Sequence, residues 1–177
     1  MKKLNFIILL FGLFNFTLAA NITIHHGIRA EVFPAKHAIS VVDTLTLPWQ
    51  VVPPTIEFNL HSGLVVNSLT PGVEVKLLKA NLSGKDTGMD VEAPEVLERV
   101  KQNRYRLLGK GGAKLPQKIV LKFEGQIYHP IQALTEEYAR GFSTTPGIID
   151  TQGVYLAGSS IWPVSYTHLT LPTIYSV

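Results

Sequence analysis

Apolar and polar residues alternate one by one along much of this chain. The pattern is clear in residues 39–47, 56–61 and 73–77, and it is longest in residues 118–128. Successive side chains of a β-strand point to opposite faces, so this alternation predicts strands with one buried face. A helix would instead need apolar residues three or four positions apart. The chain is therefore predicted to be mainly β.

Turn-forming residues separate these segments. Ser62-Gly63 and Pro71-Gly72 are short examples, and residues 109–112 form a longer glycine-rich stretch that we interpret as a flexible hairpin connection. Many short strands with turn signals between them are typical of antiparallel sandwiches and barrels. We expect an antiparallel β-sandwich or saddle-like sheet domain with at most one or two short helices.

Two segments fit more than one secondary structure. Residues 93–108 could form a helix, because Pro94 suits a first helical turn and some apolar residues recur at helical spacing. The alternative is a hairpin that turns at residues 101–103, and the alternation on both arms favours it. In residues 130–140, the spacing of the apolar residues predicts a short helix after the strongest strand.

Residues 1–20 have the organisation of a secretory signal peptide. Two lysines precede a mainly apolar stretch, residues 4–18, and Ala19 and Ala20 supply the small residues at which such peptides are cleaved. An uncleaved membrane anchor is the alternative, but the stretch is shorter than the ~20 residues that span a bilayer. We expect cleavage after Ala19 or Ala20 and an exported bacterial protein, periplasmic or extracellular, without a stable membrane span.

Composition limits the remaining chain to one domain without cross-links. Residues 21–162 are enough for one core, and there is no cysteine in the sequence, so packing must hold the domain together. The formal net charge is only +3, two of the lysines lie in the signal peptide, and the others are scattered. We therefore expect no nucleic-acid partner.

Residues with the spacing of an active site are missing from the sequence. A thermolysin-like zinc site needs two histidines one helical turn apart, and His25-His26 are adjacent while the other histidines have no partner at that spacing. We interpret them as scattered surface histidines. Gly158-Ser159-Ser160 lacks the pattern of a nucleophilic serine and reads as a polar strand or turn. We predict no catalytic, cofactor-binding or metal-binding residue in this chain.

Four segments nevertheless carry a recognisable series of patterns. Residues 25–44 contain a histidine-led strand and then a strand with Asp43 before a threonine. Residues 58–66 have the pattern F-x-L-x-x-x-L-x-V, and residues 121–127 have the pattern L-x-F-x-G-x-I. Residues 153–163 begin with G-x-Y-L and end in Trp-Pro. In this order they resemble the amino-terminal domain of M1-family (gluzincin) aminopeptidases. The family commonly has Tyr in place of Phe123 and another Tyr between Trp162 and Pro163.

The resemblance implies a saddle-shaped antiparallel domain that packs on a thermolysin-like catalytic domain. The family's zinc helix, substrate-binding segment and catalytic tyrosine have no counterpart in this sequence, so the resemblance assigns no catalytic residue and implies a truncated, non-catalytic domain. The implied parent enzyme removes amino-terminal residues from peptides with a zinc-activated water and a glutamate base. The implied partners are the missing catalytic domain of the same polypeptide and, for the parent, peptide substrates.

Residues 163–177 differ from the rest of the chain. Their sequence resembles translated sequencing-adapter peptides and continues no strand pattern with a visible partner. We therefore expect a non-native tail that is unpacked and dispensable.

Three interpretations of function remain open. The first is the amino-terminal domain of an M1-like zinc peptidase, the second a stand-alone β-sandwich binding or adhesion module, and the third the same domain of an M1-like scaffold that lacks zinc. The first predicts an exposed apolar face for a partner domain, made from Val154, Tyr155, Leu156, Ile161 and Trp162.

Overall fold

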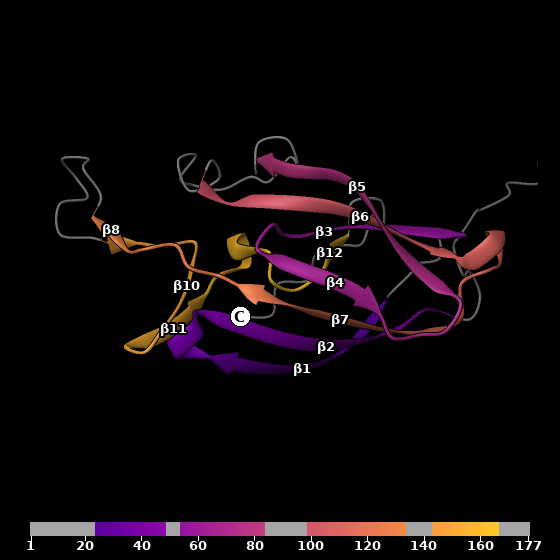
Figure 1. Cartoon of the computed structure of the whole chain (residues 1–177), viewed down its shortest axis with the longest axis horizontal. Coiled ribbons are helices and arrows are strands. Elements are labelled where there is room, and N and C mark those ends of the chain that lie inside the picture. Colours follow the sequence, from indigo (N-terminus) through magenta and orange to yellow (C-terminus); the bar gives the residue numbers. More distant parts are fainter. Residues whose placement is uncertain (1–23, 49–53, 84–98, 134–142, 167–177) are drawn as a thin grey trace, which may run out of the picture.

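The computed structural model describes residues 24–48, 54–83, 99–133 and 143–166. Within them the chain is mainly β, all the strand pairs are antiparallel, and the helical elements that lie wholly inside the described ranges are single 3₁₀ turns (Figure 1). The predicted fold class is confirmed. The segment predicted to be a signal peptide lies outside the described residues.

The first of two main sheets contains the amino-terminal hairpin. Its strands are β1 (His25–Phe33), β2 (Ala38–Thr46), β7 (Lys118–Gln126) and β4 (Leu64–Ser68), in the spatial order β1-β2-β7-β4. A 3₁₀ turn, η1 (Pro34–Lys36), joins β1 to β2. The residue after this turn, His37, has a φ of 54°, which reverses the chain into β2.

The second main sheet faces the first. Its strands are β12 (Ser165–Tyr166), β3 (Thr55–His61), β6 (Lys101–Gly109) and β5 (Val73–Ser83), in the order β12-β3-β6-β5. Figure 1 shows the two sheets as two layers, with β1 at the free edge of the first. The strands predicted at residues 39–47, 56–61, 73–77 and 118–128 correspond to β2, β3, β5 and β7.

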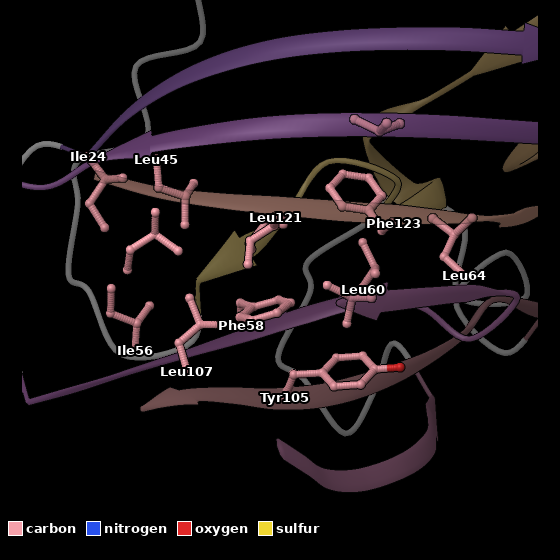
Figure 2. Packing of buried hydrophobic residues seen from close by; sticks show 14 of the residues in the cluster. Ile24, Leu45, Ile56, Phe58, Leu60, Leu64, Tyr105, Leu107, Leu121 and Phe123 are labelled. Carbon is pink, nitrogen blue, oxygen red and sulfur yellow. The ribbon is translucent and has the colours of Figure 1, made fainter. Parts of the chain in front are cut away.

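One core fills the space between the sheets. Phe123 and Leu121 of β7 lie on one side and Phe58 and Leu107 lie on the other, and all four are fully buried (Figure 2). Buried residues alternate with more exposed ones along β2 and β7, along β3 up to Phe58 and along β6 from Tyr105, which is the origin of the period of two. The two sheets therefore form a sandwich.

Two small hairpins lie at one end of the sandwich. One pairs β10 (Gly147–Asp150) with β11 (Gly153–Leu156), and the other pairs β8 (Gln132–Ala133) with β9 (Ser143–Thr144). Both are at the left in Figure 1. A 3₁₀ turn, η5 (Gly158–Ser160), leads from β11 back to the core.

For residues 93–108, the strand arm predicted at residues 104–107 is confirmed, whereas the turn at residues 101–103 and a helix that continues to residue 108 are wrong. Residues 101–108 all belong to one long strand, β6, which pairs with β3 and β5. The glycine-rich residues 109–112 are also not a hairpin connection. They include a 3₁₀ turn, η3 (Lys110–Gly112), between β6 of one sheet and β7 of the other.

The short helix predicted for residues 130–140 is wrong where the structure describes them, since Gln132–Ala133 is strand β8; residues 134–140 lie outside the described part. The prediction that residues 163–177 are unpacked is also wrong at the start of this segment. Val164 is buried in the core, and β12 pairs with Phe58 and Asn59 of β3. Residues 167–177 lie outside the described part.

Among the described residues, no helix is both long enough and apolar enough to cross a membrane.

Candidate functional site

A groove opens at the end of the sandwich that carries the small hairpins. It has a volume of about 530 Å³, and its walls come from the β10–β11 hairpin and from the segment that follows β7. An isolated β-bridge between Tyr128 and Ile148 holds these two walls together. The residues that matter for its chemistry are Tyr128, Ile131, Ile148, Asp150, Val154 and Tyr155.

Four large apolar or aromatic side chains are exposed on the walls of the groove. Tyr128, Ile131, Val154 and Tyr155 are between 46% and 60% exposed. Apolar side chains gathered in a groove make it a candidate interaction surface, whereas apolar residues exposed singly need no explanation. Tyrosines add a hydroxyl to an apolar ring, so they can contact both a hydrophobic and a polar ligand.

Asp150 gives the groove a negative charge. It ends β10, and its carboxylate accepts hydrogen bonds at 3.2 Å from the backbone N–H of Gln152 and at 3.2 Å from the Thr151 hydroxyl. These bonds, the Gln152 one first, lower the pKa of Asp150, with a further contribution from His37. The carboxylate is therefore ionised at neutral pH and fixed at the tip of the hairpin.

His37 supports the groove from behind. Its Nδ1 lies 2.6 Å from the carbonyl oxygen of Ile149, and since a carbonyl can only accept, Nδ1 is the donor. The ring packs on Tyr128 with a centroid distance of 4.2 Å, and Nδ1 is 3.7 Å from an oxygen of Asp150. His37 thus links the turn after β1 to both walls of the groove.

A second cluster, the histidine pair, lies beside the groove. His61 at the end of β3 and His129 after β7 approach each other with a distance of 2.9 Å between their Nε2 atoms. The backbone N–H of Gly63 donates to Nδ1 of His61 at 3.0 Å, so the proton of a neutral His61 must be on Nε2. His61 Nε2–H then donates to His129 Nε2, which places the proton of a neutral His129 on its Nδ1.

The histidine pair is built to stay uncharged. Burial, reinforced by neighbouring His129, lowers the pKa of His61 to about 4. Burial and the positive charge of Arg99 also lower the pKa of His129. Arg99 is held close by, because its guanidinium donates to the carbonyl oxygen of Pro130 at 2.9 Å.

A third polar contact lies inside the first sheet. His26 on β1 places Nδ1 2.8 Å from a carboxylate oxygen of Asp43, which is fully buried on β2. A buried carboxylate without such a partner would cost several kcal/mol. The contact therefore explains how an acidic residue occupies a core-facing position of β2.

The interpretation of the histidines as scattered surface residues is wrong for His61, which is buried, whereas His26 is exposed and His37 and His129 are half-buried. Sequence reasoning missed the His61–His129 contact because the two residues are 68 positions apart and only the pairing of the sheets brings them together. The one signal in the sequence for this contact was that each histidine lies at the end of a segment with alternating apolar and polar residues. Ser160, in contrast, is a buried turn residue whose hydroxyl donates to the carbonyl oxygen of Ala157 at 2.6 Å.

The apolar face predicted from residues 154–162 is only partly present. Val154 and Tyr155 are exposed in the groove, but Ile161 is buried and Trp162 packs against the core. Within the described residues, no three side chains of the types His, Cys, Asp and Glu gather at a point that could hold a metal ion.

Comparison with known proteins adds no relative: no protein-family model, no curated protein and no solved structure matches the chain.

Proposed function

We propose that this chain is the amino-terminal, non-catalytic β domain of an exported M1-like zinc aminopeptidase, and that the groove between Tyr128 and Tyr155 contacts the catalytic domain. The proposal rests on one observation, the four exposed apolar side chains that line the groove. The order of the sequence motifs that resemble the M1 family and the antiparallel sandwich agree with it.

In this proposal the chain binds and does no chemistry. The parent enzyme would hydrolyse the first peptide bond of a peptide with a zinc-bound water and a glutamate base. The described residues contain no ligand set that fits zinc. We therefore assign the zinc ion to the catalytic domain and derive no catalytic step for a residue of this chain.

The groove suits a protein partner for two reasons. Its apolar walls lose contact with water when a partner covers them, which contributes about 25 cal/mol for each Å² of apolar surface. Asp150 is fixed at its rim by hydrogen bonds of the turn, so it offers a charge with little entropy left to lose. A basic or amide group of the partner would pair with it.

The test uses the protein expressed from its complete genomic reading frame. This protein should hydrolyse aminoacyl reporters, and a chelator should abolish the reaction. Val154→Asp should lower the melting temperature of the catalytic domain, because the change places a charge in the interface. Leu69→Asp is the matched control, since Leu69 is equally exposed but lies outside the groove.

Two other results would contradict the proposal, and each would favour one of the alternative functions. A protein that shows the Val154→Asp effect but neither binds zinc nor hydrolyses the reporters is a zinc-less scaffold. A reading frame without any metallopeptidase domain identifies a self-contained binding module.

The self-contained module has a specific observation in its favour. Ile161 is buried and Trp162 packs against the core, so this part of the chain closes its own sandwich. With Trp49 replaced by Phe, Trp162 is the sole indole, and its protection from a soluble quencher reports on that packing. A separate measurement, the solvent accessibility of Tyr128 and Tyr155 in the complete protein, distinguishes the two proposals, because a docked domain would protect these tyrosines and a self-contained module would leave them exposed.

A further inference from the structure

Strand β1 is a long edge with a free side. It contains nine residues, all of them exposed, and in the described part of the chain it pairs only with β2 (Figure 1). Ile28 and Val32 lie on the face that points toward the core side of the sheet, yet they remain 42% and 38% exposed. Such an edge is a template for one more strand, and proteins usually blunt it.

The sequence of β1 is complementary to itself around Ala30. If a second β1 runs antiparallel with Ala30 opposite Ala30, three kinds of cross-strand pair form. Arg29 lies opposite the second copy's Glu31, Ile28 opposite Val32, and Gly27 opposite Phe33. Opposite charges, two β-branched residues and an aromatic ring over a glycine are all favourable neighbours on a sheet.

Neighbouring registers lack this complementarity. Centring the pair on Arg29 or on Glu31 places two like charges directly opposite each other, which destabilises a sheet. A shift by a single residue places Ile28 opposite Glu31 and turns the apolar face of one strand against the polar face of the other. Among these registers, only the one centred on Ala30 satisfies both faces.

The charges that define this register are accessible. Arg29 and Glu31 are 83% and 61% exposed, and they lie on the polar outer face of the sheet, beside Ser40 and Lys122. Within one strand the two charges are 3.6 Å apart, so in the pair they form a group of four alternating charges.

We propose that β1 is a homodimer interface, and that two copies of this chain pair through β1 about a two-fold axis at Ala30. The two first sheets then form one continuous eight-stranded sheet in the order β4-β7-β2-β1-β1-β2-β7-β4. The apolar side chains Ile28 and Val32 of both copies become neighbours, which shields part of their surface from water. This inference does not depend on the proposed function.

One experiment exchanges the charges in the full 177-residue chain. Arg29→Glu and Glu31→Arg should each weaken self-association about tenfold or more in sedimentation equilibrium, because each places like charges opposite each other. An equimolar mixture of the two variants should associate again, since every pair in the mixed dimer has opposite charges. Lys118→Glu, on the same face of the same sheet but outside this group of charges, should have no effect.

A second experiment fixes the register. The chain has no cysteine, so Ala30→Cys introduces the only thiol. Directly opposite residues of an antiparallel pair have Cβ atoms about 4.5–5.5 Å apart, close to the separation that a disulfide needs. Mild oxidation should therefore link Ala30→Cys chains into dimers. Val65→Cys, exposed on β4 at the other edge of the sheet, should stay unlinked.

Each negative result overturns the proposal. If the chain is monomeric at high concentration and Ala30→Cys links no faster than Val65→Cys, then Arg29 and Glu31 are charges that keep this edge unpaired. If the chain associates but the mixture of charge variants fails to restore association, another surface forms the dimer.

Discussion

The His61–His129 pair depends on both rings remaining neutral. A proton on Nε2 of His129 would face the Nε2–H of His61 across 2.9 Å and replace a hydrogen bond by repulsion. In the unfolded chain both rings are solvated and take up protons at ordinary pH values. The pair therefore connects the stability of the fold to pH.

This connection predicts acid sensitivity with a defined direction. The pKa of His61 is about 4 in the folded protein and near 6.5 when unfolded, so between these values the unfolded chain binds more protons. The contribution of His61 to the free energy of unfolding is complete above pH 6.5, and roughly 3 kcal/mol of it is lost as the pH falls toward 4. Denaturant titrations between pH 4 and pH 6.5 should show this loss of unfolding free energy. In the His61→Gln variant, the unfolding free energy should depend much less on pH.

A non-titrating destabilised variant is the control for this experiment. Val66→Ala removes buried apolar surface and no ionisable group. It should therefore lower the unfolding free energy at every pH and leave the slope of unfolding free energy against pH unchanged. A slope that is the same with and without His61 would show that other groups cause the acid sensitivity.

Gly125 permits a close approach that no other residue allows. Its φ is +154°, and a Cβ there would lie 2.0 Å from the carbonyl oxygen of Gly63 in the β3–β4 turn. Gly125→Ala should therefore cost at least the 1–3 kcal/mol that is typical of about one excess methyl group in a packed site. Gly158→Ala is the control, because a Cβ there meets no atom within 4 Å. Equal melting temperatures of the two variants would contradict the prediction.

Strands were predictable from the sequence where one face is buried and the other is solvated. β2, β3 and β7 have that environment, and their alternation is direct evidence of it. β6 begins with three polar residues that imitate a turn, although Gln102 is buried within the strand. β5 was predicted too short, because register shifts after Leu77 and Lys79 interrupt its alternation.

The groove and the histidine pair could not be predicted in the same way. Each combines residues from strands that are distant in sequence, and a single sequence contains no signal for which strands are neighbours. The presence of Val154 and Tyr155 on an exposed surface was predicted, whereas the burial of Ile161 depends on the turn η5, where Ile161 adopts a φ of 51°.

Strand β12 provides a prediction about the carboxyl-terminal segment. Val164 is buried in the core and the two residues after it pair with β3. A chain that ends at Trp162 should therefore be less stable than the full chain by about 1.5–3 kcal/mol, the contribution of one buried apolar side chain. Val164→Ser in the full chain should reproduce much of the loss. Thermal denaturation of the full chain, the shortened chain and the Val164→Ser variant tests this prediction. Equal melting temperatures would show that the segment is dispensable.

At the scale of the whole molecule, the described residues combine a closed core with an open groove that has apolar side chains on its walls. The closed core holds the sheets together without a disulfide, and the open surface is the groove beside the β10–β11 hairpin. This combination is typical of a domain that folds by itself and then binds.

The open surface predicts dye binding by the folded protein. A hydrophobic fluorescent dye should bind the native chain, and the double change Val154→Ser/Tyr155→Ser should reduce its fluorescence severalfold because it removes two walls of the groove. Leu69→Ser changes an exposed apolar residue elsewhere and should leave the signal unchanged. Native chain that binds no dye would count against the groove as an interaction surface.

The pairing of β2 with β7 also determines how the chain must fold in time. The partners in this pair run from Ala38 with Gln126 to Thr46 with Lys118, so the centre of the first sheet cannot form until most of the domain has been synthesised. Closing so long a loop is entropically slow, and domains dominated by such contacts refold in about milliseconds to seconds rather than microseconds. Until β7 arrives, the β1–β2 hairpin has unpaired backbone on both sides, and a nascent chain is then most exposed to aggregation.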